Sequence, residues 1–154
     1  MLIAVPLLAP SASATVIECN GGAETDGSSP QWGDCAPLGD CADNDIYTND
    51  VLVWNDQHVV KNLGNPPPYP AGLQYHFTID IYRWVSGSRG AWITGASETL
   101  TADPGLTETN TQTVQATYTG WNGADPSNCT FEVYRTIVPI TQGAGGPWTR
   151  SVVI

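Results

Sequence analysis

The sequence predicts an all-β protein, a single immunoglobulin-like β-sandwich of roughly 7–9 mainly antiparallel strands with little or no helix. Three observations support this fold class. No long stretch places apolar residues at helical spacing, and 16 glycines and 12 prolines recur along the 154 residues. Short runs rich in β-branched and aromatic residues alternate with turn-forming residues. The length suits one domain with a sizeable core.

The expected strands follow one another with short connections. They cover residues 15–19, 45–54, 58–63, 73–87, 91–96, 111–121, 130–140 and 148–154. We expect the second and third of them to form a hairpin that turns at Asn55-Asp56-Gln57. The segment 65–70, NPPPYP, lacks backbone donors at its prolines and is expected to be a stiff extended connector. Turns are expected within 101–110 and 122–128, each of which contains Asp-Pro.

Two of the expected strands contain the same order of residue types. TIDIYR covers 78–83 and TFEVYR covers 130–135. Either duplication of half a sandwich or chance explains this pattern, since Thr, Tyr and aliphatic residues favour any strand. In both segments apolar residues alternate with Thr and the acidic residue, which predicts one buried and one solvated face. Arg83 and Arg135 are in phase with the apolar residues, so we expect them to reach solvent or to pair with a carboxylate.

The first 14 residues resemble a secretory signal peptide in composition. An apolar run, Leu2 to Pro10, precedes the small-residue site at 12–14, although no Lys or Arg precedes the run. The run is shorter than the ~20 residues that a membrane-spanning helix needs, so no membrane span is expected. Residues 1–14 are therefore either a cleaved signal or a retained strand, and we expect residues 15–154 to form the sandwich. A retained segment would assemble with a neighbouring subunit through its apolar side chains: Leu2, Ile3, Val5, Leu7 and Leu8.

The four cysteines are Cys19, Cys35, Cys41 and Cys129, and an even number behind a secretion-like N-terminus predicts two disulfides. Their spacing does not choose among the three possible pairings; we expect Cys35–Cys41 and Cys19–Cys129. Zinc binding is not expected, because no CxxC pair is present. The predicted location is extracellular or at the cell surface.

The charge of the chain limits its partners. There are 15 acidic and 5 basic residues, which gives a net charge of −10. So acidic a surface repels phosphate groups, and we expect neither nucleic acid nor an anionic membrane as a partner.

An acidic stretch between residues 34 and 50 is a candidate calcium site. Asp and Asn side chains supply the oxygen ligands that calcium prefers. The candidate ligands are Asp40, Asp43, Asp45 and Asp50. The stretch lacks the glycine and the glutamate that an EF-hand requires, and a solvated acidic loop is the alternative. No other cofactor is expected.

Recognisable catalytic groups are scarce. The chain has two histidines, His58 and His76, of which His76 shares a strand face with Asp80. No GxSxG sequence occurs, and no Ser or Cys has the context of a nucleophile. We therefore expect a protein that is not an enzyme.

The six tryptophans divide by their context. Trp54, Trp84 and Trp92 lie in expected strands, where packing in the core is the default. The candidates for stacking on a glycan stand near glycines in expected turns: Trp32, Trp121 and Trp148.

Together these features predict a secreted or cell-surface, non-enzymatic β-sandwich with a structural or adhesive role. Its specific form would be a pilus-like filament subunit that adds its N-terminal segment as a strand to a neighbour and so builds a polymer or coat. The alternative is an extracellular carbohydrate-binding module that uses exposed tryptophans.

The fate of residues 1–14 separates these two functions. If the mature protein keeps them, donor-strand addition is head-to-tail and grows filaments, so deletion of residues 1–14 should abolish the filaments seen by electron microscopy. Intact mass gives the mature N-terminus in the same preparation. A protein that retains Met1 and yet remains a monomer contradicts the filament hypothesis.

Overall fold

The computed structural model describes residues 15–35, 49–118 and 130–154, which form eight strands and no helix. In chain order the strands are β1 (Val16–Thr25), β2 (Gln31–Gly33), β3 (Val51–Lys61), β4 (Leu73–Val85), β5 (Ser88–Ala102), β6 (Thr107–Thr117), β7 (Phe131–Pro139) and β8 (Trp148–Val153). Residues of alternating polarity explain the extended conformation. In β4, for example, every second residue from Leu73 to Ile81 is buried.

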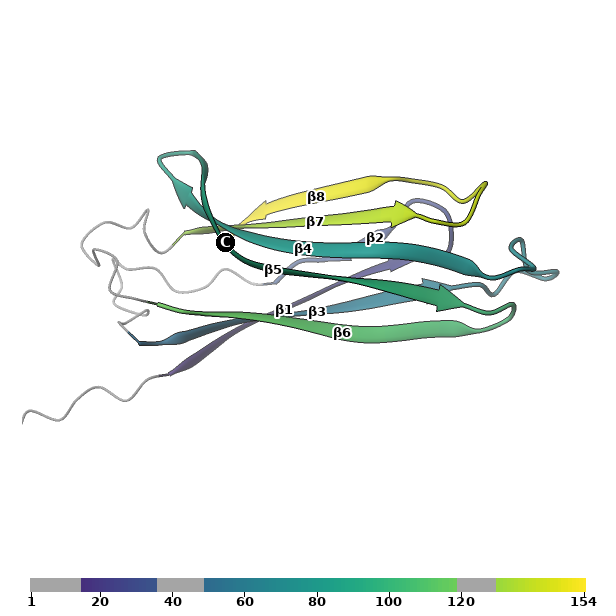
Figure 1. Ribbon diagram of the computed structural model, residues 1–154, viewed down its shortest axis with the longest axis horizontal. Helices are drawn as coiled ribbons and strands as arrows, with labels where there is room; N and C mark the ends of the chain where they lie inside the picture. Colours follow the sequence, from purple (N-terminus) through teal and green to yellow (C-terminus); the bar gives the residue numbers. More distant parts are fainter. Residues whose placement is uncertain (1–14, 36–48, 119–129) are drawn as a thin grey trace, which may run out of the picture.

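The strands form two four-stranded sheets that face each other (Figure 1). Sheet A has the order β2-β1-β3-β6, and sheet B has the order β5-β4-β7-β8. All neighbouring strands are antiparallel except β1 and β3, which pair in parallel over ten residues. The all-β fold, the sandwich and the number of strands confirm the prediction, whereas this strand order does not establish an immunoglobulin-like connectivity. Among the described residues no helix is long and apolar enough to cross a membrane.

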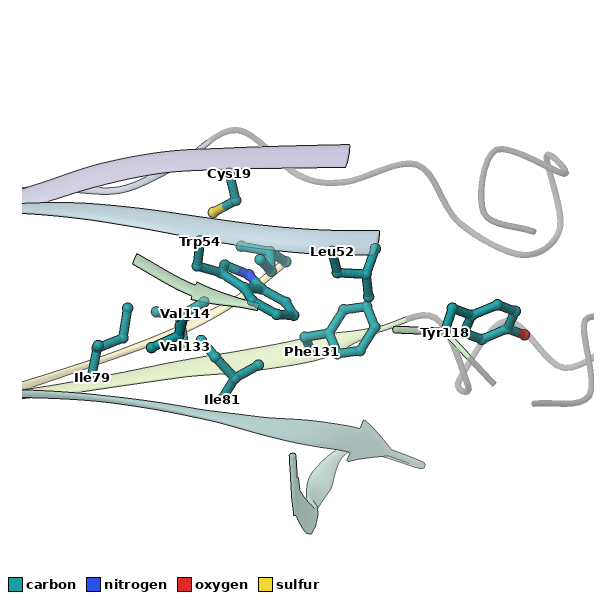
Figure 2. Packing of buried hydrophobic residues seen from close by; sticks show 10 residues of the cluster. Cys19, Leu52, Trp54, Ile79, Ile81, Val114, Tyr118, Phe131 and Val133 are labelled. Atoms are coloured by element: carbon teal, nitrogen blue, oxygen red, sulfur yellow. The ribbon is translucent and has the colours of Figure 1, made fainter. Parts of the chain in front are cut away.

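Two hydrophobic clusters fill the space between the sheets. The first contains Trp54 and Phe131, whose rings meet edge to face with centroids 5.6 Å apart (Figure 2). The second surrounds Tyr75 and Phe77. Burial raises the pKa of the Tyr75 hydroxyl to about 12, and this hydroxyl donates to the Gly145 carbonyl oxygen at 2.9 Å.

A layer of buried charged groups separates the two clusters. On β3, Asp56 and His58 follow Trp54 and precede Val60, and all four side chains point inward. Arg135 lies between the sheets opposite them on β7, and its Nη1 is 3.0 Å from Oδ1 of Asp56. The expectation that Arg135 pairs with a carboxylate is thus confirmed.

The same layer explains why the predicted hairpin at residues 55–57 is wrong. β3 runs without interruption from Val51 to Lys61. The polar residues in its middle do not mark a turn, because Asp56 faces Arg135 inside the sandwich and Asn55 accepts a hydrogen bond from Thr113 on the outer face (2.7 Å).

β1 and β5 are also longer than expected, whereas β4, β7 and β8 match their expected ranges within two residues. β4 and β5 are joined by a turn at Ser86 and Gly87, both of which have positive φ (50° and 80°), as two-residue hairpins require. β5 then continues to Ala102, and the chain turns within residues 103–106 to enter sheet A as β6. The short strand β2 was not expected from the sequence.

The described disulfide joins Cys19 to Cys35, so the expected pairs Cys35–Cys41 and Cys19–Cys129 are wrong. The cause is the hairpin of β1 and β2, which returns the chain antiparallel to β1 and leaves the two Cα atoms 5.2 Å apart. Cys41 and Cys129 lie outside the described residues. A disulfide is compatible with an extracellular location.

Replacing both Cys19 and Cys35 by Ala should lower the free energy of unfolding by about 3 kcal/mol. The disulfide joins residues that are 16 positions apart, and it therefore restricts a loop of that length in the unfolded chain. Urea denaturation followed by circular dichroism measures the difference from the wild type. Peptide mapping without reduction is the companion experiment, since it identifies the bonded cysteines directly. A map that joins Cys35 to Cys41 would overturn this pairing.

Candidate functional site

The outer face of sheet B carries a cluster of aromatic and charged side chains from three neighbouring strands. We call it the sheet B patch. Its members are Asp80 and Tyr82 from β4, Arg89 and Trp92 from β5, and Glu132 and Tyr134 from β7.

The two repeated segments of the sequence build the centre of this patch. β4 and β7 are antiparallel neighbours, and their register places Asp80 opposite Tyr134 and Tyr82 opposite Glu132. Residues with odd numbers in the same segments, such as Ile81, point into the core. Alternation along each strand therefore places both acids and both tyrosines on the outer face.

Trp92 is the most exposed aromatic residue of the patch, with 57% of its surface accessible. Its Nε1 donates a hydrogen bond to Oδ1 of Asp80 at 3.0 Å. Gly95 lies opposite Asp80 in the register, and a Cβ at this position would be only 2.3 Å from the same carboxylate oxygen. The glycine thus leaves the space in which Asp80 holds the indole. The expectation that Trp92 packs in the core is wrong, because it faces outward from an edge strand.

Arg89 crosses the patch from β5 to β7. Its Nε and Nη2 donate to the two carboxylate oxygens of Glu132 at 2.5 and 3.2 Å. The guanidinium carbon lies 4.3 Å from the ring centroid of Tyr82 and 4.7 Å from that of Tyr134. This arrangement fixes both rings through cation–π contacts.

The electrostatics of Glu132 follow from these contacts. The hydrogen bond from Arg89 lowers the pKa of the Glu132 carboxyl; burial opposes this shift, and a hydrogen bond from Ser151 adds to it. Glu132 is therefore held as a carboxylate. A general acid in glycoside cleavage needs the opposite, a raised pKa.

Chemically, the patch combines a fixed, exposed indole with hydrogen-bond donors and acceptors on the same face of sheet B. The Trp92 ring offers an apolar surface, Asp80 an acceptor and Arg89 a donor. Carbohydrates present both apolar ring faces and hydroxyl groups, so this combination suits them.

The structure places the tryptophans proposed for glycan stacking elsewhere. Trp32 lies beneath the guanidinium of Arg135, 5.2 Å from ring centroid to Cζ, and contacts the second hydrophobic cluster. Trp148 stacks on Tyr75 with centroids 5.9 Å apart. Both are half-buried on the inner side of the sheets, and Trp121 lies outside the described residues.

Of the four candidate calcium ligands, the structure describes only Asp50. Its side chain is 1% exposed, and its Oδ1 accepts a hydrogen bond from the backbone N–H of Thr15 at 2.9 Å. Asp40, Asp43 and Asp45 lie outside the described residues, so the calcium site stays a prediction. Among the described residues no three His, Cys, Asp or Glu side chains are grouped as a metal site.

The two histidines have structural contacts. His58 is buried in the charged layer, between Asp56 (2.9 Å) and Glu98 (2.5 Å). His76 lies on the same face of β4 as Asp80, as expected, and this is the outer face of sheet B; its Nδ1 is 3.0 Å from Oγ1 of Thr99.

No family model, curated protein or solved structure shows significant similarity to this chain. A functional assignment therefore depends on the geometry of the molecule itself.

Sequence analysis did not identify the sheet B patch, although a signal was present. The segments 78–83 and 130–135 repeat an acid and a tyrosine at the same spacing. Had the two segments been assumed to pair, both acids and both tyrosines would have been placed on one face. Nothing in the local sequence marks Trp92 as exposed, because its strand is an edge strand only in the assembled sheet.

Acidification should destabilise the protein in part through Glu132. Because folding lowers this pKa, the carboxylate stabilises the fold above the ordinary pKa of a glutamate, and this stabilisation is lost as the pH falls through the lowered value. The variant Glu132→Gln should have a lower melting temperature than the wild type at neutral pH, and its melting temperature should fall less on acidification. Glu18→Gln, at an exposed position of β1, is the matched control. If the melting temperatures of the wild type and Glu132→Gln fell equally as the pH is lowered, the role of Glu132 would be contradicted.

Proposed function

We propose that this protein is a secreted or cell-surface, non-enzymatic β-sandwich with an adhesive role, and that it binds carbohydrate through the sheet B patch. The observation that carries the proposal is Trp92, an exposed indole held in place by Asp80. Tyr and Trp side chains are enriched at binding surfaces, because each combines a large apolar ring with a group that forms hydrogen bonds.

Preorganisation supports a binding role for this indole. The hydrogen bond from Nε1 to Asp80 fixes one edge of the ring, so little rotational freedom is lost when a sugar stacks on it. Arg89 is likewise held by Glu132 and by two tyrosine rings. A rigid set of groups on strands favours binding more than the same groups on loops do.

The charge of the patch favours a neutral sugar. Arg89 and Glu132 form an ion pair, which leaves the carboxylate of Asp80 as the excess charge. The protein as a whole carries a net charge of −10, which disfavours sulfated or uronic acid polymers. Asp80 is suited to accept hydrogen bonds from sugar hydroxyl groups.

The non-enzymatic part of the proposal is supported by the contacts of the two acids. Asp80 accepts a hydrogen bond from Trp92, and Glu132 forms a two-point ion pair with Arg89. The lowered pKa of Glu132 is the opposite of what the general acid of glycoside hydrolysis requires.

The filament form of the structural hypothesis concerns residues 1–14, which lie outside the described residues. The next segment, β1, is not available as a donor strand for a neighbouring subunit, because it pairs with β3 of its own sheet along its whole length. We therefore place the carbohydrate-binding function first.

Binding to immobilised cellulose, chitin, xylan and mannan tests the proposal. Wild-type protein should be retained by at least one of them, and Trp92→Ala should weaken that binding about 30-fold, since losing a dominant aromatic contact costs about 2 kcal/mol. Asp80→Asn should weaken it less, because the ring remains.

The matched control is Leu106→Ala, which truncates a residue with 58% exposure in the turn before β6. It should bind as the wild type does. Equal binding by wild type and Trp92→Ala, or no retention of the wild type by any of the four polymers, would refute the proposed function.

A further inference from the structure

The outer edge of β6 is an open strand edge in the described part of the chain, where β3 is the one strand that pairs with β6 (Figure 1). We propose that this edge binds β6 of a second copy of the protein, in antiparallel orientation, and forms a two-fold symmetric dimer. The inference does not depend on the proposed function.

The backbone geometry of β6 provides the donors and acceptors. Hydrogen bonds join Asn62 N to Leu106 O (3.0 Å) and Tyr118 N to Asp50 O (2.8 Å) at the two ends of the pairing with β3. Hydrogen-bonded positions recur at every second residue of an antiparallel pair, so the even-numbered residues of β6 bond to β3. The N–H and C=O groups of the odd-numbered residues between 107 and 117 therefore point toward the open edge.

The composition of β6 does not protect this edge. Its 11 residues, TETNTQTVQAT, include one acid, Glu108, and no Lys, Arg or Pro. Charged residues and prolines are the usual means by which proteins prevent edge-to-edge pairing. A regular edge of this length with a single charge is suited to accept another strand.

The other three edges formed by the described strands are short, charged or irregular in part. β2 has only three residues and pairs with β1 at Gly22, Ala23 and Glu24, while the disulfide between Cys19 and Cys35 holds the chain after β2 against β1. β8 carries Arg150, which forms an ion pair with Asp34 next to β2 and so links the two sheets at that side. β5 pairs regularly with β4 from Thr94 to Ala102 but has register shifts around Tyr82, where it also carries Arg89. β6 is the long edge strand that is regular throughout and carries no basic residue or proline, which favours it as the edge that binds a partner.

The sequence of β6 is complementary to itself in one register. A two-fold axis at Gln112 places Thr111 opposite Thr113 of the other copy, and Glu108 opposite its Ala116. No like charges then face each other, although each protein is strongly acidic. All of the outward-pointing backbone groups of β6 find partners in this register.

The dimer would contain a continuous eight-stranded sheet made from two copies of sheet A. The symmetry axis of an antiparallel strand pair is perpendicular to the sheet, so both copies of sheet B lie on the same side. The outer faces of the two sheets B, where Trp92 is exposed, then point in the same direction. Such an arrangement suits simultaneous attachment to one surface.

Sedimentation analysis of the full-length chain over a range of concentrations tests the proposal. We expect the wild type to reach twice the 16.4 kDa chain mass as its concentration rises. Thr111→Pro removes one outward-pointing N–H without touching the hydrogen bonds to β3, so it should remain at the single chain mass. Thr111→Val keeps that N–H and should dimerise as the wild type does.

Two further variants distinguish pairing through β6 from contacts made elsewhere on the protein. Thr111→Lys combined with Thr113→Lys places like charges opposite each other across the axis and should also give a monomer, with an unchanged circular dichroism spectrum. Deletion of residues 1–14 should leave the dimer intact. A wild type that is monomeric at all concentrations, equal dimerisation of Thr111→Pro, or loss of the dimer on deleting residues 1–14 would overturn the proposal; the last result would assign the edge to the N-terminal segment.

Discussion

The buried guanidinium of Arg135 is the interaction on which the arrangement of the two sheets depends. It starts on β7 in sheet B and reaches sheet A, where it donates to Asp56 (3.0 Å) and to the carbonyl oxygens of Gly22 and Gly33 (2.9 and 3.1 Å). The side chains of Arg135 and Asp56 are each only 3% exposed. A buried charge is tolerated only with such partners, and loss of one partner typically costs about 3–5 kcal/mol. The pair therefore fixes how the sheets are placed on each other.

The charged layer extends from this pair toward β5. Asp56 also contacts Nε2 of His58, and Nδ1 of His58 contacts Glu98. The imidazole ring stacks on Phe77 with centroids 4.5 Å apart. On the other side, Asp34 joins Arg135 to Arg150 of β8, and the hydrogen bond from Arg150 lowers the pKa of the Asp34 carboxyl. Directional polar contacts thus extend across the sandwich from β5 to β8. They fix the position of one sheet on the other more strictly than hydrophobic packing alone would.

The repeated segments relate this interior to the outer surface. Within residues 130–135, the side chain of Arg135 enters the charged layer while Glu132 and Tyr134 face outward. Because side chains alternate along β7, the register that places Glu132 opposite Tyr82 and Tyr134 opposite Asp80 also turns Arg135 inward. A slip of one residue would turn every side chain to the opposite face and destroy both the layer and the patch. Stability of the fold and geometry of the candidate site therefore rest on the same strand pairing.

The sequence by itself determined the fold class, the strands β4, β7 and β8 within a few residues, and the two-faced character of residues 78–83 and 130–135, because alternation along a strand is a local property. It also indicated that Arg135 would either reach solvent or pair with a carboxylate. Only the tertiary structure decided which carboxylate, and with it that residues 55–57 continue a strand. The pairing of Cys19 with Cys35 and the exposure of Trp92 were likewise decided by neighbours in space. The reason is physical: whether a polar or aromatic residue is buried, paired or exposed depends on the strand placed beside it, which local sequence does not specify.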